Sequence, residues 1–195
     1  VAMNFPAGRW VEVGGHRMHV IDRGAGDPIV FVHGNPSWSF LWRGLIDDLS
    51  ADHRTIAADH IGMGRSDKPT DAGYPHRLER RIDDLEELLD TLGVEGNVTL
   101  VAHDWGGMIG LGWAVRHPER VARIVLGNTS AFPLPPGKRV PWQLRLARSP
   151  IGALAVRGLN AFCRGATRQC VMRPMSAEAR AGYLAPYDSW NNRIA

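Results

Sequence analysis

Short apolar runs alternate with longer stretches of helical spacing along the chain as far as residue 126. Six runs have the length and composition of β-strands, namely residues 9–13, 18–22, 28–32, 54–58, 98–102 and 121–126. Apolar side chains recur every three or four residues over 38–49 and 78–92, which predicts helices. The runs at 28–32, 98–102 and 121–126 are apolar almost throughout, which is typical of strands buried on both faces. The pattern predicts an α/β fold with a mostly parallel sheet and helices on both faces.

Two further features complete the predicted architecture. The first two runs flank Gly14 and Gly15, which indicates a β-hairpin at the start of the sheet. After Asn128 the composition changes to a proline-rich stretch, with Pro133, Pro135, Pro136 and Pro141. Helical spacing then returns at 142–147, 151–162 and 177–184 without a strand. We therefore expect a core over residues 1–130 and a helical cap over residues 131–195.

The run at 98–102 leads into the pattern of a nucleophile elbow. In such an elbow a strand, a sharp turn with one reactive side chain and a helix follow one another, with small residues two positions before and after that side chain. Here Asp104 occupies the turn, with Ala102 and Gly106 at the small positions. A carboxylate can attack carbon without a neighbouring base, and a helix N-terminus favours its ionised form. The alternative is that Asp104 only caps the helix.

Asn35 follows the strand at 28–32, and the carboxyl ends of parallel strands meet at one edge of the sheet. The backbone N–H groups of Asn35 and Trp105 are therefore predicted to form an oxyanion hole. Their side chains supply two more donors for an anionic leaving group. The alternatives are a turn role for Asn35 before proline and a packing role for Trp105. His33 and His60 are expected to fix loops through hydrogen bonds rather than to transfer protons.

Composition and charge exclude several classes of function. The 195 residues are 44% hydrophobic and 22% charged, as in an ordinary globular protein, and no apolar run is long enough to span a membrane. The two cysteines, Cys163 and Cys170, are too few for a disulfide framework and fit a cytoplasmic location. Basic residues dominate 138–180, but no aromatic-interleaved basic motif accompanies them, so no nucleic-acid partner is expected.

No cofactor or metal is expected either. The glycines around Met63 lack the remaining glycine of a dinucleotide fingerprint, and no P-loop lysine follows them. His16 and His19 lie close together, but no third ligand stands at a useful spacing.

At this point the chain resembles the haloalkane dehalogenases of the α/β-hydrolase superfamily. Four stretches carry the resemblance: HGNPSWSFLWR (33–43), DHIGMGRSDKP (59–69), HDWGGMIG (103–110) and NTSAFP (128–133). The resemblance implies an α/β-hydrolase fold, with Asp104 as the nucleophile and Asn35 and Trp105 as the leaving-group donors.

The cap resembles a narrower group, the β-lactone decarboxylases of bacterial olefin biosynthesis. The stretches are NTSAFPLPPGKRVPWQL (128–144), GLNAFCRGA (158–166) and APYDSWNNRIA (185–195). This resemblance implies a small hydrophobic substrate, a cis-3,4-dialkyl β-lactone (oxetan-2-one) that yields a cis-alkene and CO2. The basic residues of the cap permit docking of partner enzymes of a lactone-forming pathway. We favour this activity over halide release from haloalkanes. An epoxide hydrolase, which would need Tyr183 and Tyr187 as donors, and a non-catalytic relative rank below these two.

Two parts of the family's machinery have no counterpart in this sequence. Members of the family use a histidine after the last strand and an acid that orients it, whereas residues 127–131 hold no acid and none of the eight histidines fits that place. We therefore expect the chain to correspond to about the N-terminal two-thirds of such an enzyme, with the C-terminal strands missing. The isolated chain should be inactive, or become alkylated once at Asp104 and stall. We also expect an open sheet edge and an uncovered apolar face.

Overall fold

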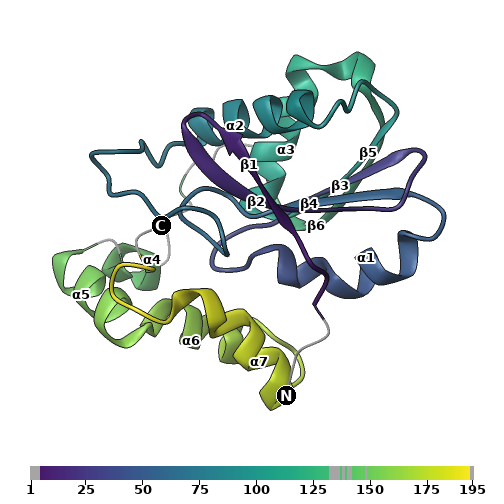
Figure 1. Cartoon of the computed structure of the whole chain (residues 1–195). Helices are drawn as coiled ribbons and strands as arrows, with labels where there is room; N and C mark the ends of the chain where they lie inside the picture. The colour runs from purple at the N-terminus through teal and green to yellow at the C-terminus, as the bar shows by residue number, and fades with distance from the viewer. Residues whose placement is uncertain (1–4, 132–136, 138, 140–141, 148, 194–195) are drawn as a thin grey trace.

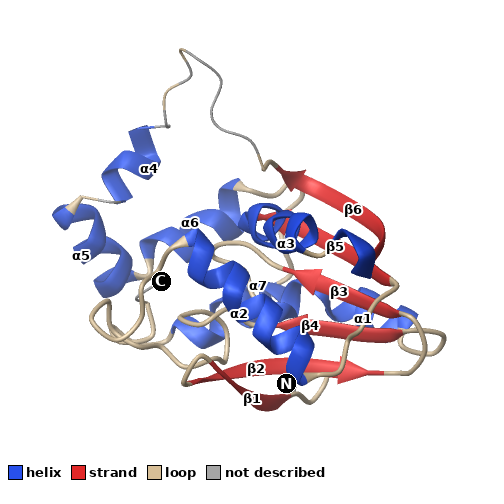
Figure 2. Cartoon of the chain, turned by 90° about the horizontal axis from the view of Figure 1, so that it is seen from above, coloured by secondary structure: helices blue, strands red, loops and turns tan. Residues whose placement is uncertain are grey.

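The computed structural model describes residues 5–131, 137, 139, 142–147 and 149–193. Six strands form one sheet in the order β1-β2-β4-β3-β5-β6 (Figure 2). Their bounds are β1 (Arg9–Val13), β2 (His16–Arg23), β3 (Pro28–Val32), β4 (Arg54–Ala58), β5 (Val98–Asp104) and β6 (Val121–Thr129). The hairpin β1–β2 is antiparallel, as is the pair β2–β4, and β4, β3, β5 and β6 are parallel. The predicted mostly parallel α/β sheet is confirmed.

Helices cover both faces of the sheet (Figure 1). The helices up to β6 are η1 (Ser39–Trp42), α1 (Arg43–Leu49), α2 (Leu78–Thr91), α3 (Trp105–Arg116) and η2 (Pro118–Arg120). α2 and α3 pack on one face, and α1 lies on the other. No helix among the described residues combines the length and the apolar composition that a membrane crossing requires.

The alternation of side chains along β3 explains why the sheet has two hydrophobic cores. Val30 and Val32 point to the larger core, which contains Leu88 of α2 and Trp113 of α3. Ile29 and Phe31 point to the smaller core on the opposite face, together with Trp42 and Ile46. Because successive side chains of a strand face opposite ways, β3 must be apolar throughout to sit between two helical layers.

The prediction that residues 121–126 form a buried strand is wrong. β6 is exposed along most of its length, with Ile124 45%, Val125 53% and Leu126 50% exposed. Its hydrogen bonds run to β5 on one side, and no strand of the described chain pairs with its other side. The apolar composition predicted burial, but burial also requires a neighbour, which the described residues do not provide. β5 itself is fully buried on one face and only half-buried on the other.

Only helices follow β6 in the described part of the chain. They are α4 (Trp142–Ala147), α5 (Pro150–Leu159), α6 (Ala161–Gln169), α7 (Ala177–Leu184) and η3 (Ala185–Tyr187). The single helix predicted over 151–162 is wrong, because Asn160 adopts a left-handed conformation that ends α5 and begins α6. The four prolines of the 131–141 stretch lie outside the described residues. The boundary at residue 130 stays a prediction.

Contacts between the last helices and the core lie at the loop after β3. The indole N–H of Trp38 donates to the carbonyl oxygen of Gly182 in α7 at 3.2 Å. The ring of Phe40 packs edge-on against Tyr183, with ring centroids 5.2 Å apart. The helices after β6 are therefore anchored at the carboxyl edge of the sheet, where β3 ends.

Candidate active site

Asp104 lies at a sharp turn between β5 and α3, with backbone angles φ 53° and ψ −127°. Residues other than glycine rarely adopt such a positive φ, and holding one there costs about 1–3 kcal/mol. The neighbouring turn residues have no room for side chains. A Cβ atom on Gly106 would collide with the carbonyl of Val32, and one on Gly107 would collide with the side chain of Thr129. The turn therefore matches the elbow predicted from the spacing of small residues.

The carboxylate of Asp104 contacts the loop after β3. The backbone N–H of Asn35 donates to Asp104 Oδ1 at 2.8 Å, although the two residues are 69 positions apart. The carbonyl oxygen of Asp104 accepts a hydrogen bond from Thr129 Oγ1 at 2.6 Å. The side chain of Asp104 makes no capping hydrogen bond to α3. The geometry therefore does not support the alternative in which Asp104 merely caps the helix.

Gly34 explains how the two loops approach so closely. A Cβ atom at this position would overlap the carboxylate of Asp104. Only glycine lets the backbone of the loop pass the carboxylate closely enough for the next residue, Asn35, to donate its N–H.

Asp104 opens onto a depression of about 310 Å³. The depression is lined by Asp104, Trp105, Met108, Asn128, Thr129 and Ser130. Trp105 is 38% exposed, and its indole N–H has no acceptor among the described residues. Asn35 therefore meets Asp104 through its backbone, whereas Trp105 contributes an exposed aromatic wall and a free donor.

Sequence reasoning missed the contribution of β6 to this depression. β6, which lies beside β5 in the sheet, ends with Asn128 and Thr129, and Ser130 follows it. Along the sequence, only a resemblance to known families singles out the stretch 128–133. The available signal was its position at the carboxyl end of a predicted strand, where ligands bind in open α/β sheets.

His33 and His60 lie behind the site and hold its loops, as predicted. His33 Nε2 accepts a hydrogen bond from the backbone N–H of His60 at 3.1 Å, and His60 Nε2 bonds the carbonyl of His33 at 3.0 Å. Burial lowers the pKa of His33. Burial, together with the positive charges of His33 in its protonated form and of Arg81, holds the pKa of His60 well below its usual range. Both rings are therefore neutral near pH 7 and committed to backbone partners, and no described histidine hydrogen-bonds to Asp104.

A buried pair, Asp59 and His19, anchors the loops that flank the site. His19 Nδ1 lies 2.9 Å from Asp59 Oδ2, and both side chains are fully buried. Asp59 also accepts hydrogen bonds from the backbone N–H groups of Ser39 and Arg65, at 2.7 and 2.9 Å. Burial by itself raises the pKa of Asp59, but the hydrogen bond from His19 and these backbone donors hold it below its usual range. His19 Nδ1 is thus committed to a carboxylate that holds both loops.

The two tyrosines required by the epoxide hydrolase alternative face elsewhere. Tyr187 is buried, and its hydroxyl donates to the carbonyl of Ser37 at 3.4 Å. Tyr183 packs against Phe40. Neither residue lines the depression at Asp104. No cluster of three or more histidine, cysteine or acidic side chains within the described ranges has the arrangement of a metal site.

Comparisons with known proteins identify the family and the fold of the chain. A family described as alpha/beta hydrolase fold matches residues 27–156. A cis-3-alkyl-4-alkyloxetan-2-one decarboxylase from Shewanella oneidensis is 53% identical over 183 residues, which cover 93% of this chain and 58% of that protein. The enzyme of the same name from Xanthomonas campestris is 50% identical over 189 residues, covering 93% of this chain and 63% of that protein.

Haloalkane dehalogenases are more distant relatives. One from Mycolicibacterium smegmatis is 43% identical over 190 residues, covering 93% of this chain and 60% of that protein. The crystal structure of the haloalkane dehalogenase DatA from Agrobacterium tumefaciens superposes with a TM-score of 0.85 at 29% identity, covering 98% of this chain and 66% of that one. The chain therefore spans 58–63% of the length of these curated relatives.

Proposed function

The chain belongs to the alpha/beta hydrolase fold family, and we propose that its Asp104 opens cis-3,4-dialkyl β-lactones, with release of a cis-alkene and CO2. The observation that carries the proposal is the 2.8 Å hydrogen bond from the backbone N–H of Asn35 to Asp104 Oδ1. It restrains one carboxylate oxygen and leaves Oδ2 to attack. The relatives at 53% and 50% identity are named as decarboxylases of 3,4-disubstituted oxetan-2-ones, which supports this substrate class.

The first step is displacement at the ring carbon C4. Asp104 Oδ2 forms a bond to C4, and the bond from C4 to the ring oxygen breaks. The electron pair of the broken bond stays on the ring oxygen, which becomes part of a free carboxylate. The free indole N–H of Trp105 and the side-chain amide of Asn35 are the donors for this new negative charge. The N–H of Asn35 stays on Oδ1, which becomes the carbonyl oxygen of the enzyme ester.

The second step restores Asp104. The substrate carboxylate leaves as CO2, the electron pair of its bond to C3 forms the C3–C4 double bond, and the pair of the C4–Oδ2 bond returns to Asp104. Displacement inverts C4, and elimination from the antiperiplanar arrangement then gives the cis-alkene from a cis-lactone. Atoms and charges balance without water, a base or a cofactor.

A haloalkane dehalogenase is the second candidate, because it needs the same first step at the same residues and the relative at 43% identity carries that name. The two reactions differ afterwards. An alkyl ester formed from a haloalkane has no carboxylate to lose, so release requires an activated water molecule, and none of the described histidines is placed to activate one at Asp104.

The proposal extends to the surroundings of the reaction. The substrate is small and hydrophobic, and the site is divided between a core at 1–130 and a cap at 131–195. A strained four-membered lactone has to be supplied by a lactone-forming enzyme, so such an enzyme is the proposed partner. The proposed location is the cytoplasm.

The test compares two substrates on this chain. The sequence alone predicts that the isolated chain is inactive or stalls after one alkylation, but the elimination step proposed for a β-lactone needs no base. We therefore expect a cis-3,4-dialkyl β-lactone to give cis-alkene, measured by gas chromatography, without a lasting adduct on Asp104. We expect 1-bromohexane to give one equivalent of bromide and one hexyl adduct, located at Asp104 by intact-mass and peptide mass spectrometry. The matched control is Asp104→Asn, which keeps the size of the side chain and removes the nucleophile.

The outcomes separate the candidates. Alkene from the lactone, lost in Asp104→Asn, supports the decarboxylase. Repeated bromide release from one chain supports the dehalogenase instead and contradicts our assignment of the histidines. If neither substrate gives product or adduct, the nucleophilic role of Asp104 in this chain is wrong.

A further inference from the structure

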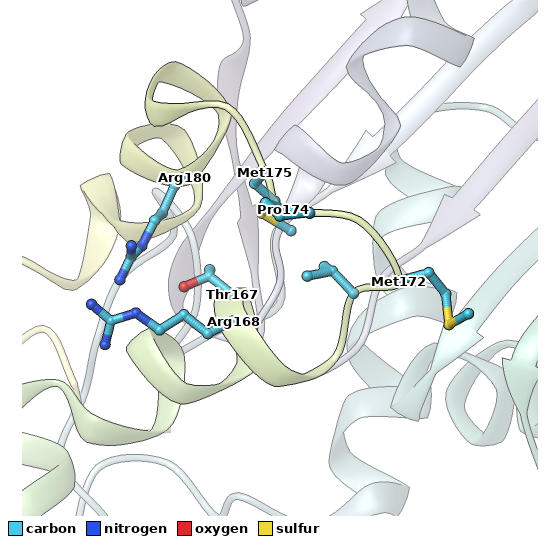
Figure 3. A pocket seen from close by; sticks show the side chains of 7 residues that line it. Thr167, Arg168, Met172, Pro174, Met175 and Arg180 are labelled. Atoms are coloured by element: carbon cyan, nitrogen blue, oxygen red, sulfur yellow. The ribbon is translucent and has the colours of Figure 1, made fainter.

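A second open cavity, of about 380 Å³, lies between α6 and α7 (Figure 3). It shares no lining residue with the depression at Asp104. Its volume falls within the range of about 300–1,000 Å³ that is typical of small-molecule sites. The cavity is thus large enough for a ligand of its own.

Two arginines form the polar side of this cavity. Arg168 comes from α6 and Arg180 from α7, and Figure 3 shows their guanidinium groups projecting to the same side. Neither forms an ion pair with a carboxylate among the described residues, which include Glu178, the acid in the first turn of α7. Two neighbouring positive charges repel each other, so the arrangement favours an anion that binds to both.

A buried donor without a partner points to the same conclusion. Arg180 Nε is buried and has no hydrogen-bond acceptor among the described residues. Buried N–H groups are nearly always paired, and leaving one unpaired is costly. An oxyanion in the cavity would accept this hydrogen bond and offset the positive charge of the two guanidinium groups, since planar guanidinium matches planar or tetrahedral oxyanions well.

The remaining wall of the cavity is mostly apolar. Apart from Thr167 of α6 it consists of Val171, Met172, Pro174 and Met175, which follow α6 and lead into α7. A fully hydrated ion would leave these side chains against water, whereas an alkyl chain would bury them. Methionines also adapt to ligands of variable shape. The two sides of the cavity therefore fit the two ends of an amphiphile.

We propose that the cavity between α6 and α7 binds an alkyl chain that ends in an oxyanion. Arg168 and Arg180 bind the oxyanion, and the chain lies against Val171, Met172, Pro174 and Met175. The proposal uses neither Asp104 nor its reaction, so it stands independently of the proposed function. A carboxylate and a phosphate monoester share the required chemistry, and the test distinguishes them.

The probes are decanoate, decyl phosphate, decanol and inorganic phosphate, each titrated into the chain by calorimetry below its micelle concentration. We expect saturable binding of decanoate, decyl phosphate or both, and at least tenfold weaker binding of decanol and of inorganic phosphate. The difference between decanoate and decyl phosphate identifies the preferred head group.

Two double variants test the assignment. Arg168→Gln/Arg180→Gln should weaken binding of the alkyl oxyanion at least tenfold. Arg164→Gln/Arg173→Gln removes the same charge from arginines of the same region that do not line the cavity, and it should bind as the parent does. Thermal unfolding of both variants checks that each is folded.

Three outcomes would overturn the proposal. In the first, the parent chain binds decanol as tightly as decanoate. In the second, the two double variants weaken binding of the alkyl oxyanion equally. In the third, the chain binds phosphatidylglycerol vesicles but none of the monomeric probes. The first comparison needs no variant, so it holds even if a substitution disturbs folding.

Discussion

Replacing Asp104 by glycine should make the chain more stable than replacing it by alanine. Both substitutions remove the carboxylate and its hydrogen bond from Asn35. They differ only in whether a Cβ atom remains at a residue with φ 53°. The comparison therefore isolates the backbone strain of the elbow from the loss of its side chain.

The size of the effect follows from two opposing contributions. A left-handed or otherwise sparsely populated backbone conformation costs a non-glycine residue about 1–3 kcal/mol. Glycine loses about 0.5–1 kcal/mol relative to alanine because its unfolded chain is more flexible. Subtracting the second cost from the first predicts that the free energy of unfolding of Asp104→Gly exceeds that of Asp104→Ala by as much as about 2.5 kcal/mol. For a chain of this length that is a Tm difference of up to about 10 °C.

The assay is urea and thermal unfolding followed by circular dichroism, with intact-mass spectrometry to show that neither variant is alkylated. Val101→Ala and Val101→Gly form the control pair, because Val101 lies in the same strand and is paired regularly with Phe31 and Val125. There alanine should be the more stable residue. If alanine is also the more stable residue at position 104, the elbow is not strained and this reasoning is refuted.

Three further predictions follow from the same contacts. Gly34→Ala places a Cβ atom against the carboxylate of Asp104. It should slow the alkylation of Asp104 by 1-bromohexane about 10²-fold, as measured by adduct formation. An unchanged rate would contradict the observed packing of the two loops. The pKa of Asp59 in the folded chain lies below the unfolded value of about 3.9. Asp59 therefore stabilises the fold above that pH, and this contribution is lost as the pH falls towards the folded pKa. Asp59→Asn should flatten the decline of the free energy of unfolding between about pH 5 and pH 2. An equally steep decline in the variant would assign the acid sensitivity to other groups. Leu126 on β6 is half exposed, so Leu126→Lys should reduce aggregation measured by light scattering. The free energy of unfolding should change by less than about 0.5 kcal/mol. A large loss of stability would mean that Leu126 is covered in solution.

Local patterns in the sequence predicted the six strands and the sharp turn at Asp104. Apolar periodicity indicates which side chains share a face, and the small residues around Asp104 indicate a tight turn. Both signals depend only on a few neighbouring residues, so they can be recognised in the sequence. For this reason the strands 28–32 and 54–58 are found with the predicted bounds, and the elbow lies where its spacing placed it.

The contacts of Asp104 could be found only from the three-dimensional fold. The pairing of Asp104 with the N–H of Asn35 depends on β3 lying beside β5, a matter of strand order that no local pattern encodes. The same holds for His19, whose partner Asp59 comes from another strand end, and for β6, whose apolar residues are exposed because burial depends on neighbours rather than on composition. Local sequence specifies which surfaces are apolar and where the chain turns, whereas contacts between distant residues depend on how all of those surfaces are assembled at once.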